Sequence, residues 1–502
     1  MSECKTKPAG MTRRELFAGA AATGMLAAGG IPLAARAAGA AKAAAPQGPV
    51  LADRLAAYAH GLAYDDLGAG TVEAVKVRFV DALGCAIAAL KDPKVTKVRE
   101  AMLELGGRTG SSTVIGTDRK VSVDLAAFAN GAAIRNFDLN DVYLGRQAGH
   151  PSDNIAPCLA VAEAGKLDGR SLITAVALAY EIDCRFLDAF DTDGNGWDHP
   201  IFSLPAVALA VGKLMGLTPA QMTQAVNLAM NDHLALHQTR VQNISDWKNL
   251  ADAEAGRNAI FAAILAGKGV TGPGPIFEGK DGIFKMVTKG ALPIDVASFG
   301  GKGRRFLIED CAIKRYPAQV YTQTAVAAAS AVAAEVGDLS KIVGIDVATS
   351  RKGFLFAAHD AEKWAPKTKG TADHSLPYIV SRSMLDRNIT FGSYTQEMLQ
   401  DPKLLHLIKM VKVHEEAELT AMLPKKIPTR VTARLADGRS VTRQVDALPG
   451  FAGMAMPRGD VEKKFRDTVG KAIPSERIAR LLEVCWNLEL QNDLSAVLRL
   501  LA

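Results

Sequence analysis

Helical periodicity dominates the sequence from about residue 50 to residue 267. In TVEAVKVRFVDALGCAIAAL, apolar residues recur at spacings of three and four, which is typical of one apolar stripe on a helix. These residues are Val72, Val75, Phe79, Leu83, Ile87 and Leu90. Later alanine-rich segments repeat the pattern, and AEAGRNAIFAAILAGKG ends the run at glycine. Because small side chains let helices approach closely, the pattern predicts a helical bundle or layered array.

The pattern changes near residue 300, after the glycine-rich FGGKGRR. KIVGIDVATS alternates apolar and polar residues as a half-buried strand does, and MVKVHEE is a second candidate strand. TRVTARLADGRSVTRQV predicts two strands joined at Asp437-Gly438, a strong hairpin signal. Helical segments lie between the first two strands, so this region predicts a mixed α+β fold.

A chain of 502 residues is long enough for two domains. We expect a mainly α protein with a large all-helical domain at residues 46–308 and a smaller α+β lid domain at residues 309–456. The tail, residues 457–502, is helical again and is expected to return to the helical domain.

The N-terminus resembles an export signal. Arg13 and Arg14 precede an apolar run of small residues, which ends in the A-x-A-like site Ala35-Arg36-Ala37. We expect residues 1–45 to be a twin-arginine signal and linker, with a folded, periplasmic product and no stable membrane association after cleavage. The alternative is an uncleaved anchor, although the run is weakly hydrophobic and is interrupted by Pro32.

Composition and motifs exclude several classes of function. The formal charge of +6, from 59 basic and 53 acidic residues, is too small to indicate nucleic-acid binding. None of the six cysteines forms a C-x-x-C pair, so neither a zinc knuckle nor an iron–sulfur run is expected. Phosphate-binding, dinucleotide-binding, zinc-protease and serine-hydrolase motifs are missing as well. What remains is acid–base chemistry, for which we expect no metal and no cofactor.

The segment NFDLNDVYLGRQAGHPSDNIAP gathers ionisable residues between two apolar helical segments. His150 can exchange a proton near neutral pH, with Asp138 and Asp141 nearby. Ser152 or Asp153 is expected to cap the following helix, whose N-terminus suits an anion such as a carboxylate. The alternative is that the aspartates only cap helix ends and the histidine only packs.

Two further segments contain candidate residues for the site in the helical region. Lys248, in SDWKNLADAEAGRNA, can hold a substrate carboxylate or act as a base if burial lowers its pKa. Asp198 and His199, in GWDHPIF, form a possible pair of an acid and an imidazole. The alternatives are a solvated lysine and an ordinary helix-start turn.

The predicted lid domain contributes a third group of candidates, in KRYPAQVYTQT and TADHSLPYIVSRSML. Arg315 and Tyr321 can present polar groups, unless they merely pack at a helix start. His374 and Tyr378 are four residues apart, but Pro377 disfavours a helical conformation at the residue before it. Tyr378 can donate a proton to a leaving oxygen, although tyrosines line cores more often.

Taken in order, these segments resemble the MmgE/PrpD family from about residue 50 to the end. They include VDALGCAIAAL, AAIRNFDLNDVY, GHPSDNIAP, WDHPIFSLPAVALAVGKLMGL, CAIKRYPAQVYTQTAV and DHSLPYIVSRSMLD. The family includes 2-methylcitrate dehydratase, cis-aconitate decarboxylase and iminodisuccinate epimerase, which act on small polycarboxylates without metal or organic cofactor. The resemblance implies a homodimer, with each site between a helical domain and an α+β lid.

The resemblance also implies a set of site residues. The expected catalytic residues are Asp138 to orient the site, His150 as base, Lys248 as carboxylate clamp and Tyr378 as proton donor of the lid. Further substrate contacts are expected from Asp141, Ser152, His199, Arg315, Gln319 and His374. Two positions depart from the decarboxylase branch, which has a threonine at Val142 and a histidine at Gln319.

The expected activity is therefore loss of water from a small polycarboxylate, after proton abstraction α to a carboxylate, because WDHP is closer to the dehydratase branch. Epimerisation and decarboxylation of a related acid are alternatives, and so is a catalytically silent exported protein that binds a polycarboxylate. Substrate and stereochemistry stay open at this point.

Overall fold

The computed structural model describes residues 48–231, 233–451 and 453–502, which form one compact unit. The expected twin-arginine signal lies outside the described residues. Within these ranges, no helix combines the length and hydrophobicity that a membrane span requires.

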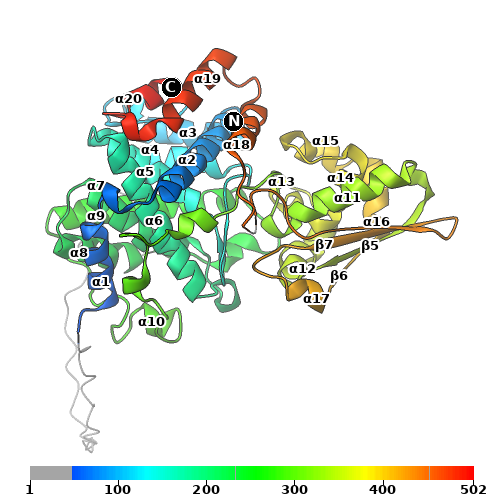
Figure 1. The fold of residues 1–502 in the computed structure, drawn as a ribbon, viewed down its shortest axis with the longest axis horizontal. Helices are drawn as coiled ribbons and strands as arrows, with labels where there is room; N and C mark the ends of the chain where they lie inside the picture. The colour runs from blue at the N-terminus through cyan, green and yellow to red at the C-terminus, as the bar shows by residue number, and fades with distance from the viewer. Residues whose placement is uncertain (1–47, 232, 452) are drawn as a thin grey trace, which may run out of the picture. The chain divides into compact units, whose positions relative to one another are not determined.

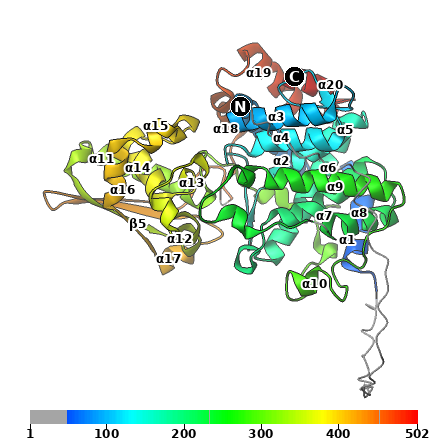
Figure 2. The same ribbon diagram turned by 180° about the vertical axis from the view of Figure 1, so that it is seen from behind.

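Helices α1 to α10 precede residue 290. They are α1 (Leu51–Gly61), α2 (Ala69–Ala89), α3 (Pro93–Gly106), α4 (Val123–Arg135), α5 (Ile155–Ala164), α6 (Gly169–Ala189), α7 (Pro200–Leu214), α8 (Pro219–Asn231), α9 (Ala251–Gly267) and α10 (Ile283–Met286). Two short ribbons interrupt them, β1 (Ser112–Thr113) with β2 (Lys120–Val121) and β3 (Tyr143–Leu144) with β4 (Ala148–Gly149). Helices α7, α8 and α9 pack on one another, as Figure 2 shows from behind.

The C-terminal segment packs on these same helices. It forms α18 (Arg458–Val469), α19 (Ser475–Trp486) and α20 (Ser495–Leu501). Helix α18 runs beside α2 (Figure 1), and the apolar side chains of the tail belong to the same hydrophobic core as α1 to α9. The helical part is thus built from two stretches of chain separated by the lid.

Helix α2 is more deeply buried than its apolar stripe predicts. Helices α4 and α6 contact it, and so do α18 and α19 of the tail. Lys76, Arg78 and Asp81 are buried with the apolar positions, and Lys464 of α18 forms an ion pair of 2.5 Å with Asp81. The single-stripe prediction was too narrow, because it could not include the returning tail.

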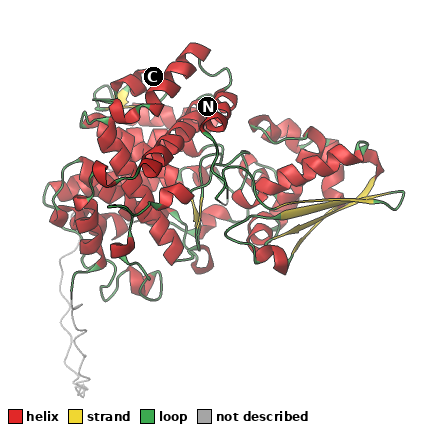
Figure 3. Ribbon diagram, viewed as in Figure 1, coloured by secondary structure: helices red, strands yellow, loops and turns green. Residues whose placement is uncertain are grey.

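The smaller α+β part lies between these two stretches. Its helices are α11 (Gln323–Val336), α12 (Arg351–Ala357), α13 (Lys369–Ala372), α14 (Leu376–Asp386), α15 (Gln396–Leu399), α16 (Pro402–Met410) and α17 (Ala417–Thr420). Its strands are β5 (Ile342–Thr349), β6 (Val411–Glu415), β7 (Thr429–Leu435) and β8 (Ser440–Val445), in the order β6-β5-β7-β8. Figure 3 shows how the longer strands are confined to this part. Side chains of α11, α14 and α16 share one hydrophobic core with β5, β7 and β8.

The predicted strands and hairpin are confirmed. Strands β7 and β8 pair antiparallel around Asp437-Gly438, and Gly438 adopts a φ of 89°, in the left-handed region that favours glycine. Val431 and Ala433 point into the core, whereas Arg434 is exposed. The chain is therefore mainly α with a smaller α+β part, as predicted. The boundaries at residues 308 and 456 stay predictions.

Short 3₁₀ helices connect these elements. They are η1 (Tyr64–Asp66), η2 (Pro151–Asn154), η3 (Asp193–Asn195), η4 (His237–Arg240), η5 (Asp246–Asn249), η6 (Val296–Ser298), η7 (Leu307–Asp310), η8 (Val320–Thr322), η9 (Leu339–Lys341), η10 (Ala361–Trp364), η11 (Phe391–Tyr394) and η12 (Leu488–Leu490). Several of them carry the polar residues described next.

Candidate active site

Asp138 is the centre of the polar cluster. It follows α4 in a left-handed conformation with a φ of 52°, unusual for a residue other than glycine, and its side chain is buried. Its carboxylate contacts the guanidinium of Arg135 and lies 3.2 Å from Lys248 Nζ and 3.1 Å from Lys314 Nζ. Burial alone would raise the pKa of this carboxyl, but the three cations hold it well below its usual range. Asp138 is therefore a permanent anion that gathers three positive charges.

His150 has the geometry of a general base. Its Nδ1 lies 2.7 Å from the backbone carbonyl of Asp141 and must donate its proton there, because a carbonyl only accepts. The other nitrogen, Nε2, is left with its lone pair, 3.9 Å from the Asp138 carboxylate. Burial, together with the nearby Arg135 and Lys314, lowers the pKa of the imidazole well below its usual value. His150 is thus neutral near pH 7, as a proton acceptor must be.

Asp141 positions this histidine and the helix behind it. Its carboxylate accepts hydrogen bonds from the backbone N–H of Ser152 at 3.0 Å and from the hydroxyl of Tyr180 at 2.9 Å. The helix N-terminus expected to receive a substrate anion is therefore occupied by Asp141. The predicted caps are also wrong, since neither Ser152 nor Asp153 caps α5, and the hydroxyl of Ser152 accepts from Asn140 instead.

Two buried lysines face Asp138 from opposite parts of the chain. Lys248 comes from η5, and burial lowers its pKa to about 7. Its ammonium has no hydrogen bond of good geometry to any described residue. Lys314 comes from the segment leading into the lid, and burial lowers its pKa to about 8. Lys314 also donates to the Asp138 carbonyl at 2.8 Å, so it joins the lid segment to the helical part.

A cavity of about 70 Å³ opens beside this cluster, between the helical part and residues 319–374 of the lid. Five of the predicted site residues line it: Asp138, His150, His199, Gln319 and His374. The other five do not line it: Lys248, Tyr378, Asp141, Ser152 and Arg315.

A second group of charges borders the cavity next to His199. Arg240 Nε lies 3.0 Å from both carboxylate oxygens of Asp198, and its terminal nitrogen lies 3.2 Å from Asp252. Asp252 also contacts Nδ1 of His199 at 3.2 Å. Burial lowers the pKa of His199, although Asp252 opposes this shift. The rings of His150 and His199 are 5.6 Å apart, so two neutral imidazoles face the same space.

His237 also lines the cavity and is paired with a carboxylate. His237 Nδ1 lies 3.0 Å from the carboxylate of Asp193, which also accepts from the side-chain amide of Gln147. Burial alone would lower the pKa of His237, but Asp193 raises it above its usual value. His374 is the opposite case, because burial and the charge on Lys248 lower its pKa to about 4. The pKa shifts of the histidines that line the cavity therefore differ in direction, upward for His237 and downward for His374.

The described residues contain no group of three histidine, cysteine, aspartate or glutamate side chains arranged to hold a metal ion.

Two family models match this chain. The MmgE/PrpD N-terminal domain matches residues 53–294, and the MmgE/PrpD C-terminal domain matches residues 316–488. The chain belongs to the MmgE/PrpD family. This MmgE/PrpD protein is similar to the 2-methylcitrate dehydratase of Salmonella typhimurium, with 28% identity over 429 residues, 81% of the chain and 87% of the relative.

Two other relatives extend the comparison. The 2-methylcitrate dehydratase of Cupriavidus necator is 26% identical over 448 residues, 84% of the chain and 89% of the relative. The cis-aconitate decarboxylase of Mus musculus is 24% identical over 475 residues, 89% of the chain and 93% of the relative. These relatives are lyases, and the MmgE/PrpD protein is a lyase of the same family.

The lid residue Tyr378 lies away from the cavity of the MmgE/PrpD protein. It is fully buried in the lid core, and its hydroxyl donates to the backbone carbonyl of Ser393. The tyrosine that does line the cavity is Tyr321, whose ring stacks on Phe356 at 6.0 Å. Its backbone N–H donates to the side-chain carbonyl of Gln319 at 2.6 Å.

Arg315 is similarly displaced from the expected position. Its side chain is exposed and lies over the ring of its neighbour Tyr316, whereas Lys314, one residue earlier, is buried against Asp138. The cations that sequence reasoning missed are Lys314, Arg135 and Arg240, and it also missed His237, Asp193 and Asp252. For Arg135 and Lys314, the available signal was a cation inside an otherwise apolar segment, in AAIRN and CAIKR.

Proposed function

We propose that this lyase removes a proton from a carbon α to a carboxylate of a small polycarboxylate and expels a β-hydroxyl as water, as a 2-methylcitrate dehydratase does. One observation carries the proposal. Three buried cations converge on the Asp138 carboxylate, beside a neutral imidazole, His150, whose Nε2 is free. Such a site can hold anionic groups and accept a proton at the same place.

The first step is proton abstraction. His150 Nε2 accepts the proton, and the Nδ1 hydrogen bond to the Asp141 carbonyl keeps the ring in the required tautomer. The imidazolium that forms is stabilised by the Asp138 carboxylate, 3.9 Å away. A general base of this kind contributes on the order of 10² to 10⁴ in rate.

The negative charge of the carbanion-like intermediate needs fixed positive groups. Lys248 is the proposed carboxylate clamp, because its buried ammonium still lacks a well-oriented acceptor. Arg135 already lines the cavity, whereas Lys248 does not. A substrate carboxylate that enters the cavity beside Asp138 can therefore reach Lys248 only after a small rearrangement of the site. Burial away from water strengthens each of these contacts.

The second step is loss of the β-hydroxyl, which needs a proton donor. Tyr321 replaces Tyr378 in this role, because Tyr321 lines the cavity, whereas the hydroxyl of Tyr378 already donates to the carbonyl of Ser393. The proton passes to the leaving oxygen as the carbon–oxygen bond breaks, so that water departs. His150 afterwards releases its proton to solvent and Tyr321 takes one up from solvent, so that both side chains return to their starting states. We propose that the chain's own side chains perform the whole reaction.

Closure of the lid accounts for the small cavity. At about 70 Å³ it is well below the ~300 Å³ at which ligand pockets usually begin. We infer a closed state, in which the lid must move away to admit a polycarboxylate and then exclude water.

Decarboxylation of a related acid is the second candidate, because relatives at 24% identity are named cis-aconitate decarboxylase. Two residues, Gln319 and Val142, favour dehydration over decarboxylation. Gln319 lines it with a neutral amide where the decarboxylase branch is expected to have a histidine, and an amide does not transfer protons near pH 7. Val142 is fully buried and pairs with Ala312, so it presents no hydroxyl.

We further propose that the protein is a homodimer, exported through the twin-arginine route to the periplasm. Light scattering behind size-exclusion chromatography tests the dimer directly.

The activity is tested by incubating the purified protein with 2-methylcitrate, citrate, aconitate and amino-dicarboxylates. We expect one hydroxy acid to lose water, with a rising ultraviolet absorbance from the new alkene. Isomerisation without absorbance change would identify an epimerase, and release of carbon dioxide a decarboxylase. Saturable binding of an acid that stays intact would identify a catalytically silent binding protein.

A further inference from the structure

Two buried thiols contact each other outside the cavity described above. Sγ of Cys184, on α6, lies 3.8 Å from Sγ of Cys311, which follows η7 at the start of the segment leading into the lid. Both residues are buried, and neither forms a disulfide. Among the described cysteines, no other pair has a thiol contact of this kind.

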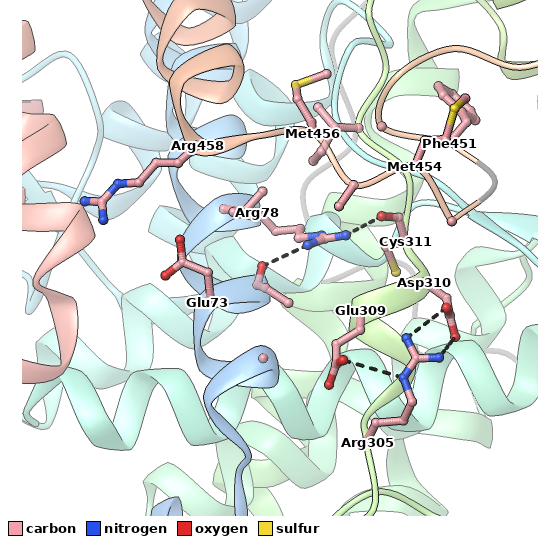
Figure 4. A pocket seen from close by; sticks show the side chains of 17 residues that line it. Glu73, Arg78, Arg305, Glu309, Asp310, Cys311, Phe451, Met454, Met456 and Arg458 are labelled. Carbon is pink, nitrogen blue, oxygen red and sulfur yellow. Dashed lines mark hydrogen bonds and ion pairs between the residues drawn. The ribbon is translucent and has the colours of Figure 1, made fainter.

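Cys311 also lines a pocket of about 420 Å³. Figure 4 shows this pocket between α2, the segment from Arg305 to Cys311, and the segment from Phe451 to Arg458. Its rim is charged, since Arg305 is bound by Asp310 and Glu309. Cys311 lines this pocket, whereas Cys184 does not.

We propose that Cys184 and Cys311 are a site of oxidation, at which a small peroxide entering the pocket converts the two thiols into a disulfide. The sulfur of Cys311 attacks one peroxide oxygen, the O–O bond breaks, and a sulfenic acid and one water form. The Cys184 thiol then attacks that sulfur and displaces its hydroxyl group as a second water. Two thiols and one hydrogen peroxide thus give one disulfide and two waters, and reduction by an added dithiol reverses the change.

The two sulfur atoms must move a short distance before a disulfide can form. A disulfide has an S–S distance of about 2.05 Å, so the sulfurs must approach each other by nearly 2 Å. Cys311 precedes Ala312, whose N–H and carbonyl both pair with Val142, and it lies three residues before Lys314. The cross-link would therefore join α6 to the segment that carries a lysine of the active site.

The thiols are not intrinsically reactive. Burial raises the pKa of both Cys184 and Cys311, so little thiolate is present at neutral pH. The reaction should therefore be slow at neutral pH and faster as the pH rises. The expected export would bring the folded protein into an oxidising compartment, where slow reactions of this kind have time to occur.

The test uses the full chain treated with hydrogen peroxide, then denatured in an alkylating reagent. We expect the free-thiol count to fall by two from the six cysteines of the sequence, and a non-reducing peptide map to contain a Cys184–Cys311 cross-link. Because the bond closes a loop between residues 127 apart, the oxidised protein should melt at a higher temperature until reductant is added. None of these measurements depends on the proposed catalytic activity.

Two variants provide the controls. Cys311→Ser should give neither the cross-link nor the higher melting temperature. Cys158→Ser, which removes a buried thiol without a thiol neighbour, should give both, as the wild type does. An unchanged thiol count in a protein that stays folded would overturn the proposal. A cross-link through other cysteines would overturn it as well.

Discussion

The ammonium of Lys248 lies 3.2 Å from the carboxylate of Asp138, yet it forms no well-oriented hydrogen bond with it or with any other described residue. A buried ammonium carries three donors, and leaving them unpaired is unfavourable. A substrate carboxylate would provide the missing acceptor, while Asp138 keeps Lys248, Lys314 and Arg135 together between turnovers.

The two lysines should set the alkaline limit of activity. Burial lowers the pKa of Lys248 to about 7 and that of Lys314 to about 8, and the proposed site needs both charges. As pH rises through these values the ammoniums lose their protons, so kcat/KM should fall. In Lys248→Arg the guanidinium stays charged, and the falling limb should move towards the pKa of Lys314. A wild-type kcat/KM that is flat from about pH 6.5 to 9 would refute the clamp.

Replacing each of the two lid tyrosines by phenylalanine should have opposite effects on kcat and on stability. Tyr321→Phe should lower kcat, because the proposed proton donor is lost, with little change in stability. Tyr378→Phe removes the hydrogen bond to Ser393 and should cost about 1 kcal/mol of unfolding free energy while kcat is unchanged. Steady-state kinetics and urea unfolding of both variants provide the comparison. The reverse pattern would return the role of proton donor to Tyr378.

Replacing Asp138 should affect both stability and activity. In Asp138→Asn three buried cations lose their shared counter-charge, and breaking a buried ion pair in this way costs about 3–5 kcal/mol. The matched control is Asp118→Asn, at an exposed position. Urea unfolding near pH 7 measures the free energy of unfolding of both variants. Equal stability of the two variants would mean that Asp138 does not hold the cluster together.

The export prediction rests on the paired arginines at the N-terminus. Changing Arg13 and Arg14 together to lysine should retain the protein in the cytoplasm, because the twin-arginine receptor reads that pair. Fractionation of a bacterial host, with the periplasmic and cytoplasmic pools quantified, measures the change. Equal periplasmic yields of the variant and the wild type would exclude this route.

Local signals predicted the lid well. Alternating residues and the Asp437-Gly438 turn determine β7 and β8 without reference to the rest of the chain. The same local reasoning placed His150, His199 and His374 among the site candidates, and all three line the cavity.

Other features depend on contacts between residues that are far apart in the sequence. Nothing local distinguishes Lys314 from Arg315; one is buried because Asp138, 176 residues earlier, lies opposite it. Tyr378 lies in α14, which begins at Leu376, and its side chain belongs to the lid core. The full burial of α2 likewise depends on the returning tail.

The most direct test of the proposed role of His150 is proton exchange in deuterated water. Wild-type protein is incubated with the hydroxy acid that it dehydrates, and the α-hydrogen is followed by proton NMR. The same measurement is made on His150→Asn and on a control at an exposed histidine, His406→Gln. We predict that wild type and His406→Gln lose the α-hydrogen signal as alkene signals appear, and that His150→Asn, with an unchanged melting temperature, is slower by on the order of 10² or more. Exchange at the wild-type rate in His150→Asn would contradict the account.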